Sequence, residues 1–245
     1  MRRRTKAILV ILGILLVIGV GFVVWGETPP RPMDEAFKAL ESDSSVTVTV
    51  GDPLIFTPKN SSPTTGFIIY PGGRVDYRSY APAAHALAAE GYLVFIIRMP
   101  LNLAVLSPNA AQRIVDTYST VTSWAVGGHS LGGSMAAQYV AGTPQRVKGL
   151  VLWASYPASG NDLSKTSLQV TTIHGTHDGL VSLNQIEESL KLLPPGTTRV
   201  EIDGGNHAQF GWYGPQQGDK DATIARKEQQ QRIIQATIQL LQKIG

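Results

Sequence analysis

A serine flanked by glycines lies near the middle of the chain, in the stretch Gly128-His129-Ser130-Leu131-Gly132. The apolar run 121–126 before it predicts a strand, and the run 134–141 after it, which ends at Gly142, predicts a helix. At a tight strand-to-helix turn a serine hydroxyl is held in the open. The residues two before and two after it must be small, because their Cβ atoms would collide across the turn. We therefore predict that Ser130 is a nucleophile.

A serine hydroxyl is a weak nucleophile and needs a base, which a third group must orient. Two later loops carry the required residue types, 174–181 with Asp178 and 203–208 with His207. Each loop directly follows an apolar run that predicts a strand, and loops at the carboxyl ends of parallel strands share one edge of the sheet. We therefore predict that His207 accepts the proton of Ser130 and that Asp178 holds the second ring nitrogen of His207.

Other residues offer alternatives for these two roles. Asp203 is close in sequence to His207 but could be a turn residue, and Asp162 follows another predicted strand. Asp178 is favoured as the acid because it lies in a tight loop directly after a strand. The other histidines are alternative bases or structural residues: His129, whose side chain is expected to turn away, His174 and His177 in the acid loop, and His85 in an alanine-rich helix.

Attack on a carbonyl creates an oxyanion, which two backbone N–H groups must bind. One donor is expected at Leu131, the residue after the nucleophile. The other is expected in the glycine-rich stretch Tyr70-Pro71-Gly72-Gly73-Arg74, at Gly73, with Arg74 as the alternative. This stretch lacks the spacing of a phosphate-binding loop, and no residues have metal-ligand spacing, so we expect neither a cofactor nor a metal.

The N-terminal segment has the composition of a membrane anchor. Residues 1–6 are basic, and residues 7–25 form an uncharged apolar run of about 19 residues, near the roughly 20 that cross a bilayer. This run is long for the core of a signal peptide and lacks a good cleavage site after Trp25, so an uncleaved single-pass anchor is favoured. The positive-inside rule places residues 1–6 in the cytoplasm and the rest of the chain on the extracytoplasmic side of the cell membrane.

Outside the basic segment the chain has no excess of positive charge. Four of the 21 lysines and arginines lie in residues 1–6, which leaves 17 against 18 acidic residues. A nucleic-acid partner is therefore not expected. The chain has no cysteine, which excludes disulfides and thiolate metal sites.

Strands and helices alternate along residues 45–245, which predicts one domain. Before it, residues 26–44 form a proline-rich linker, expected to lift the domain off the membrane, and a short helix. The runs 46–50 and 54–56 predict a hairpin. Further strands are expected at 66–70, 92–97, 121–126, 147–153, 168–174 and 198–202, and helices at 80–90, 109–119, 134–141, 183–193 and 222–244. This alternation predicts an α/β fold with a mostly parallel, doubly wound sheet.

Several of these motifs together resemble the α/β-hydrolase superfamily: Gly128-His129-Ser130-Leu131-Gly132, Pro71-Gly72-Gly73, Gly175-Thr176-His177-Asp178 and Gly205-Asn206-His207. The stretches 71–76 and 204–211 look most like the small lidless group related to dienelactone hydrolases. That group has a cysteine nucleophile, which this chain lacks, so the resemblance implies a serine variant and puts the dienelactone substrate in doubt. The loop 156–167 is only about a dozen residues long, so we expect no large cap domain.

The predicted function is that of a membrane-anchored serine hydrolase which cleaves a small-molecule carboxylic ester through an acyl-enzyme. An acyltransferase with the same triad and a non-catalytic binding module of the same fold are the alternatives. The intact set of Ser130, Asp178 and His207 argues against the binding module. The aromatic residues expected either to line the site or to pack beneath it are Tyr156, Phe210, Trp212 and Tyr213.

Overall fold

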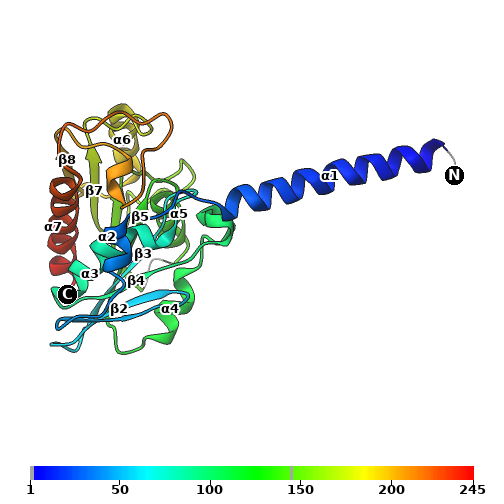
Figure 1. Cartoon of the computed structure of the whole chain (residues 1–245). Helices are drawn as coiled ribbons and strands as arrows, with labels where there is room; N and C mark the ends of the chain where they lie inside the picture. The colour runs from blue at the N-terminus through cyan, green and yellow to red at the C-terminus, as the bar shows by residue number, and fades with distance from the viewer. Residues whose placement is uncertain (1–2, 144–145) are drawn as a thin grey trace.

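A computed structural model of the chain describes residues 3–143 and 146–245, so residues 1–2 of the expected basic segment lie outside it. The long helix α1 (Arg3–Glu27) projects from a single domain (Figure 1). The short helix α2 (Asp34–Lys38) follows α1.

An eight-stranded sheet forms the centre of the described domain, with the strand order β1-β2-β4-β3-β5-β6-β7-β8. The first two strands pair antiparallel to each other, β2 pairs antiparallel to β4, and all other neighbours are parallel. The strands are β1 (Val46–Thr49), β2 (Leu54–Pro58), β3 (Thr65–Tyr70), β4 (Leu93–Ile96), β5 (Ser123–His129), β6 (Val147–Trp153), β7 (Gln169–Gly175) and β8 (Thr198–Ile202). This is the mostly parallel sheet that the sequence predicts.

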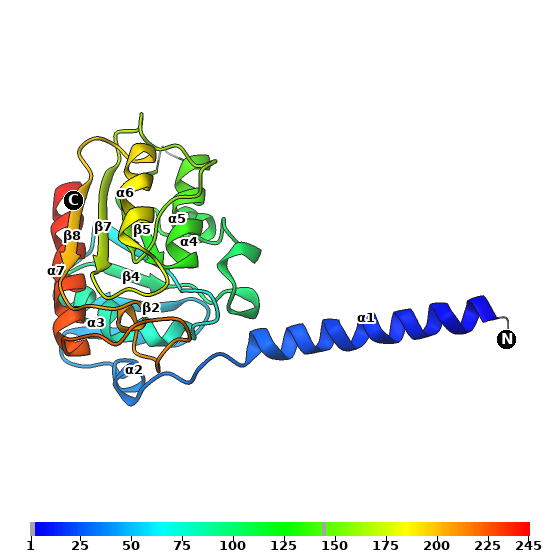
Figure 2. The same cartoon turned by 90° about the horizontal axis from the view of Figure 1, so that it is seen from above.

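Helices cover both faces of the sheet (Figures 1 and 2). One face carries α3 (Ala81–Ala89) and α7 (Arg226–Ile244), and the other carries α4 (Ala111–Thr117), α5 (Leu131–Gly142) and α6 (Leu183–Ser189). Successive residues of a strand point to opposite faces, so Phe67 and Ile68 in β3 belong to two separate hydrophobic cores. Because both faces are covered, the central strands are apolar throughout.

The elements on either side of Ser130 differ in detail from the sequence prediction. Strand β5 continues beyond residue 126 to His129, because Gly127 and Gly128 still pair with Val151 and Leu152 of β6. Helix α5 begins at once after Ser130. The predicted absence of a large cap is confirmed, since residues 154–168, all of them described, contain neither helix nor strand.

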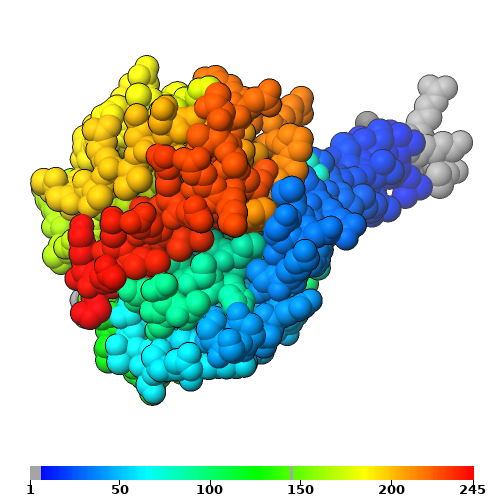
Figure 3. Space-filling view, turned by 60° about the vertical axis from the view of Figure 1, so that its left-hand side comes forward, coloured from blue at the N-terminus to red at the C-terminus, as the bar shows by residue number. Residues whose placement is uncertain are grey.

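The chain between α1 and α2 lies against the domain, where the sequence suggested a spacer. Pro32 forms a β-bridge with Tyr213, and the Met33 N–H donates to the Trp212 carbonyl oxygen at 2.9 Å. In Figure 3 this blue segment runs over the surface beside the orange segment that follows β8. The proline-rich segment is therefore bound to the domain at its far end, at Pro32 and Met33.

Candidate active site

Ser130 occupies a strained turn between β5 and α5. Its backbone has φ 52° and ψ −124°, a combination that residues other than glycine rarely adopt. A Cβ atom at either Gly128 or Gly132 would collide with the carbonyl oxygen of Tyr70, at the end of β3. The two glycines are therefore required mainly because β3 passes so close to the turn, and in addition because Gly128 faces Gly132 across it.

The structure brings Asp178 and His207 together. Nδ1 of His207 lies 2.8 Å from Oδ2 of Asp178, and both side chains are buried. The other carboxylate oxygen of Asp178 accepts hydrogen bonds from the N–H groups of Leu180 (2.8 Å) and Val181 (2.7 Å). This carboxylate is therefore fixed on both oxygens, and it fixes the imidazole through Nδ1.

The second nitrogen of that ring, Nε2 of His207, is buried and has no hydrogen-bond partner within the described residues, Ser130 Oγ included. An unpaired buried polar atom costs about 1–3 kcal/mol. Seven other buried side-chain atoms of the described residues are also unpaired, so this nitrogen is singled out by its position opposite the Nδ1 that Asp178 holds. Bonds between a nucleophile and its base are often long without substrate and shorten on binding. Ser130 lines a pocket of about 340 Å³ together with Leu180 and Val181, so the acid loop flanks the serine.

The loop after β3 presents one open N–H group beside the serine turn. The Gly72 N–H donates to Tyr80 Oη at 3.0 Å, and the Arg74 N–H donates to the Asn102 carbonyl at 2.8 Å. Among the hydrogen bonds of the described residues, none uses the N–H of Gly73. A Cβ atom on Gly73 would lie 3.2 Å from Leu131 Cδ2, and Leu131 is the first residue of α5, where helix N–H groups lack internal partners. The residue with the free N–H, Gly73, thus packs against the first residue of α5, whereas the N–H of Arg74 is already bonded.

His129 lies behind His207, although its side chain was expected to turn away from the site. The ring centroids of the two histidines are 4.4 Å apart. His129 Nδ1 lies 2.9 Å from Tyr80 Oη, which receives the Gly72 N–H and so gives its own proton to His129. Burial lowers the pKa of His129 well below its usual range, and the charge that His207 can carry lowers it further. His129 is therefore a neutral packing partner of His207.

Asp219 joins the loops that carry Asp178 and His207. Its Oδ1 accepts from the N–H groups of Gly179 (3.0 Å) and His207 (3.2 Å), and its Oδ2 accepts from the N–H of Ala208 (2.8 Å). Sequence reasoning missed this residue, because Asp219 belongs to a polar stretch with no recognisable motif. Only its place in the folded chain identifies it.

The alternative acids are bonded elsewhere. Asp162 accepts from the Ser164 N–H at 2.9 Å, and Asp203 accepts from Thr176 Oγ1 at 3.2 Å. Both are exposed, and neither is hydrogen-bonded to His207.

The alternative bases also have partners of their own: His174 contacts Glu201, His177 contacts the Asp221 carbonyl, and His85 lies 3.7 Å from Asp43.

Of the four aromatic residues, Tyr156 lines the pocket of Ser130, and Tyr213 lines a second groove. Phe210 stacks on the His129 ring with the centroids 5.6 Å apart. Trp212 is half-buried, and its carbonyl receives the Met33 N–H.

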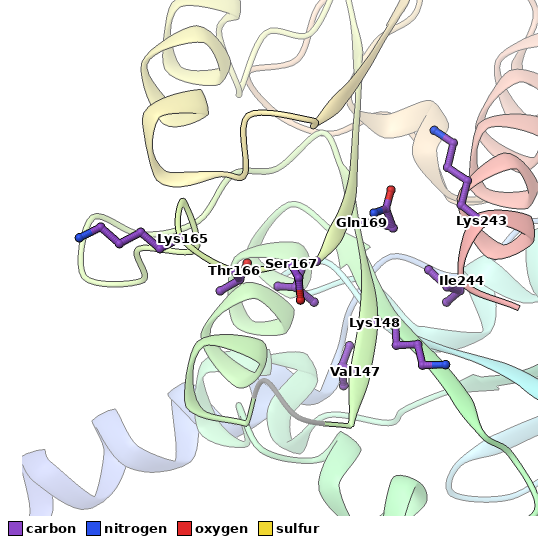
Figure 4. A pocket seen from close by; sticks show the side chains of 9 residues that line it. Val147, Lys148, Lys165, Thr166, Ser167, Gln169, Lys243 and Ile244 are labelled. Atoms are coloured by element: carbon purple, nitrogen blue, oxygen red, sulfur yellow. The ribbon is translucent and has the colours of Figure 1, made fainter.

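A larger hollow of about 720 Å³ lies at the amino ends of β6 and β7, the edge of the sheet opposite Ser130 (Figure 4). Two of its lysines already have partners, since Lys148 Nζ donates to Ser123 Oγ and Lys243 Nζ donates to Thr198 Oγ1. Within the described residues no group of three or more histidines and carboxylates could hold a metal ion. The carboxyl edge of the sheet is therefore the candidate active site.

Comparison with known proteins agrees with this fold. The model of the alpha/beta hydrolase family matches residues 66–231, and the chain therefore belongs to that family. No curated protein sequence matches the chain.

Similar solved structures include hydrolases that are named for different activities. A dienelactone hydrolase-like promiscuous phosphotriesterase, P91, from metagenomic libraries has 14% identity and a TM-score of 0.63, over 82% of this chain and 99% of that one. A thermophilic esterase from Thermogutta terrifontis has 14% identity and a TM-score of 0.61, over 89% of this chain and 96% of that one. The carboxylesterase CesB from Bacillus subtilis has 13% identity and a TM-score of 0.53, over 71% and 88%. At these identities the likeness establishes the fold, and esterases are among its examples.

Proposed function

We propose that this protein is a membrane-anchored serine hydrolase that cleaves carboxylic esters, with Ser130 as nucleophile, His207 as base and Asp178 as the acid that orients it. The observation that carries the proposal is the 2.8 Å hydrogen bond between the buried side chains of His207 and Asp178, which leaves Nε2 of His207 open. The strained turn at Ser130 supports the proposal further. The esterases among the structural neighbours favour an ester substrate.

In the proposed reaction, Ser130 Oγ attacks the ester carbonyl carbon while Nε2 of His207 takes the hydroxyl proton. The N–H groups of Gly73 and Leu131 stabilise the oxyanion. When the tetrahedral intermediate collapses, the imidazolium gives its proton to the departing alcohol and an acyl-enzyme remains. Water, deprotonated by His207, then releases the carboxylic acid and restores Ser130.

The anchor part of the proposal rests on α1. By length and composition, Ala7–Glu27 is the one helix of the described residues that could span a membrane. Trp25 itself contacts Arg74 through its ring and its carbonyl oxygen, which favours a retained anchor over a signal cleaved after Trp25. In the proposed arrangement residues 1–6 are cytoplasmic, residues 7–25 cross the cell membrane, residues 26–44 lead to the domain, and residues 45–245 lie on the extracytoplasmic side.

The test is hydrolysis of p-nitrophenyl acetate and butyrate by the full chain in detergent. Ser130→Ala is expected to lower kcat by about 10³ or more. Ser62→Ala is the matched control, because Ser62 is exposed near the amino end of β3, away from the site. Equal slow rates in the wild type and in Ser130→Ala would contradict the esterase and favour a binding module.

A further inference from the structure

A groove of about 500 Å³ connects the end of α1 to the open N–H group of Gly73. Its lining is largely apolar and includes Trp25, Val75, Leu103 and Tyr213. The groove ends at Gly73, where a Cβ atom would lie 4.0 Å from Leu103 Cδ2 and 3.2 Å from the side chain of Leu131, whose N–H is the other proposed oxyanion donor. The groove is separate from the pocket of about 340 Å³ that Ser130 itself lines.

The outer end of the groove is held against α1. The guanidinium of Arg74 lies over the Trp25 ring, 4.3 Å from its centroid, and donates to the carbonyl oxygens of Trp25 (3.1 Å) and Thr28 (3.0 Å). Asn102 Nδ2 donates to the Gly26 carbonyl at 2.9 Å, and a Cβ atom at Gly26 would lie only 2.8 Å from Leu101 Cβ. This junction is therefore tightly packed as well as hydrogen-bonded.

The junction sets where the groove opens relative to a bilayer. The 21 residues of Ala7–Glu27 make a helix about 32 Å long, close to the roughly 30 Å of a hydrocarbon core. In the anchor proposed above, Trp25 therefore lies at the membrane surface, where tryptophan is favoured. The loop 98–107 lies at the base of α1 (Figures 1 and 2), and it exposes Val105 and Leu106 by 53% and 52%.

From this arrangement we propose that the groove takes the apolar chain of an ester that resides in the bilayer. The proposal rests on the proposed function, and it names the substrate class for the same site. The chain enters between Trp25 and Leu103, and its carbonyl stops between the N–H groups of Gly73 and Leu131. The reaction is the acyl transfer to Ser130 described above, followed by hydrolysis, so no further reactant is needed.

The experiment uses the full chain in phosphatidylcholine vesicles, with 4-methylumbelliferyl oleate dissolved in the bilayer and 4-methylumbelliferyl butyrate as the short-chain substrate. The measured quantity is the ratio of kcat/KM for oleate to kcat/KM for butyrate. Leu103→Asp places a charge in the groove and is expected to lower this ratio by about tenfold or more. Leu103→Trp, which fills the groove, is expected to lower it as well.

Leu183→Asp is the matched control, because Leu183 is exposed on α6 outside the groove. Its ratio is expected to equal that of the wild type. Since the ratio is taken within one protein, loss of folded material in a variant cancels. If the wild type cleaves butyrate and neither Leu103 variant lowers the ratio, the groove proposal is wrong while the esterase proposal stands. If the wild type cleaves neither ester, both proposals fail.

Discussion

The two halves of the candidate site are built in different ways. The acid–base half, Asp178 with His207, is held by the ends of β7 and β8 and by the carboxylate of Asp219. The half that contains Gly73 is held by parts of the chain outside the sheet, namely the Asn102 carbonyl and the end of α1. The first half belongs to the hydrolase domain alone. The second depends on the helix that we propose as the anchor, so the anchor is expected to influence turnover.

The largest expected effect concerns the acid–base half. Asp178→Asn keeps the shape of the side chain but is expected to favour the wrong tautomer of His207, and kcat for p-nitrophenyl butyrate is expected to fall by about 10⁴. Asp203→Asn, at an exposed carboxylate bonded to Thr176, is the matched control, with an expected change below about threefold. If kcat fell as much in Asp203→Asn as in Asp178→Asn, the loss would not show that Asp178 orients His207.

A smaller effect is expected at the residue that joins the two loops. Asp219→Ala leaves the N–H groups of His207 and Ala208 without their acceptor in a buried place. The free energy of unfolding is expected to fall by about 1–3 kcal/mol. A displacement of His207 by about 1 Å is expected to lower kcat by about 10². Thermal unfolding and kcat are measured on the same variant. If both are unchanged, Asp219 does not hold His207 in position.

A still smaller effect is expected in the half that contacts α1. Arg74→Gln breaks the contacts with Trp25 and Thr28 while the backbone bond from Arg74 to Asn102 remains. We expect kcat to fall about tenfold, because the Gly73 N–H is held less firmly.

Arg98→Ala is the control for Arg74→Gln, since it removes an exposed ion pair with Glu27 that contributes about 0–1 kcal/mol. Equal kcat values in Arg74→Gln and Arg98→Ala would show that the contact between Arg74 and α1 does not influence turnover.

The smallest effect is on stability as a function of pH. His129 is neutral in the folded protein because its pKa is lowered, whereas in the unfolded chain it takes up a proton below a pKa of about 6.5. The unfolded state then binds more protons, so the free energy of unfolding falls as the pH falls below about 6.5, by up to about 1.4 kcal/mol per pH unit. Urea unfolding at pH 7.5 and 5.5 is expected to show a weaker pH dependence in His129→Gln than in the wild type.

The parts of the molecule that could be predicted from sequence are those that depend on local requirements. The alternation of apolar strands and helices predicts the sheet, and the order of the strand ends indicates that the loops of Asp178 and His207 meet. Glycine spacing marks the turn at Ser130, because a close backbone contact excludes every other residue there.

The remainder depends on contacts between distant segments. Arg74 meets Thr28 across 46 residues, and Tyr80 meets His129 across 49. Neither composition nor hydrophobic periodicity identifies such pairs, because each depends on polar side chains of ordinary types. The predicted strand at Ser130 also ends too early, at residue 126. Gly127 and Gly128 belong to β5 because they pair with β6, a strand that comes later in the chain.

The rigid junction between α1 and the domain has a mechanical consequence. Because the helix is packed against Leu101 and bonded through Arg74, the domain cannot swivel freely at its base. Helices slightly longer than the hydrocarbon core tilt to fit it, and the tilt changes with bilayer thickness. With α1 as the anchor that we propose, such a tilt turns the whole domain with the helix, so the thickness of the membrane sets the angle at which the groove meets the membrane surface.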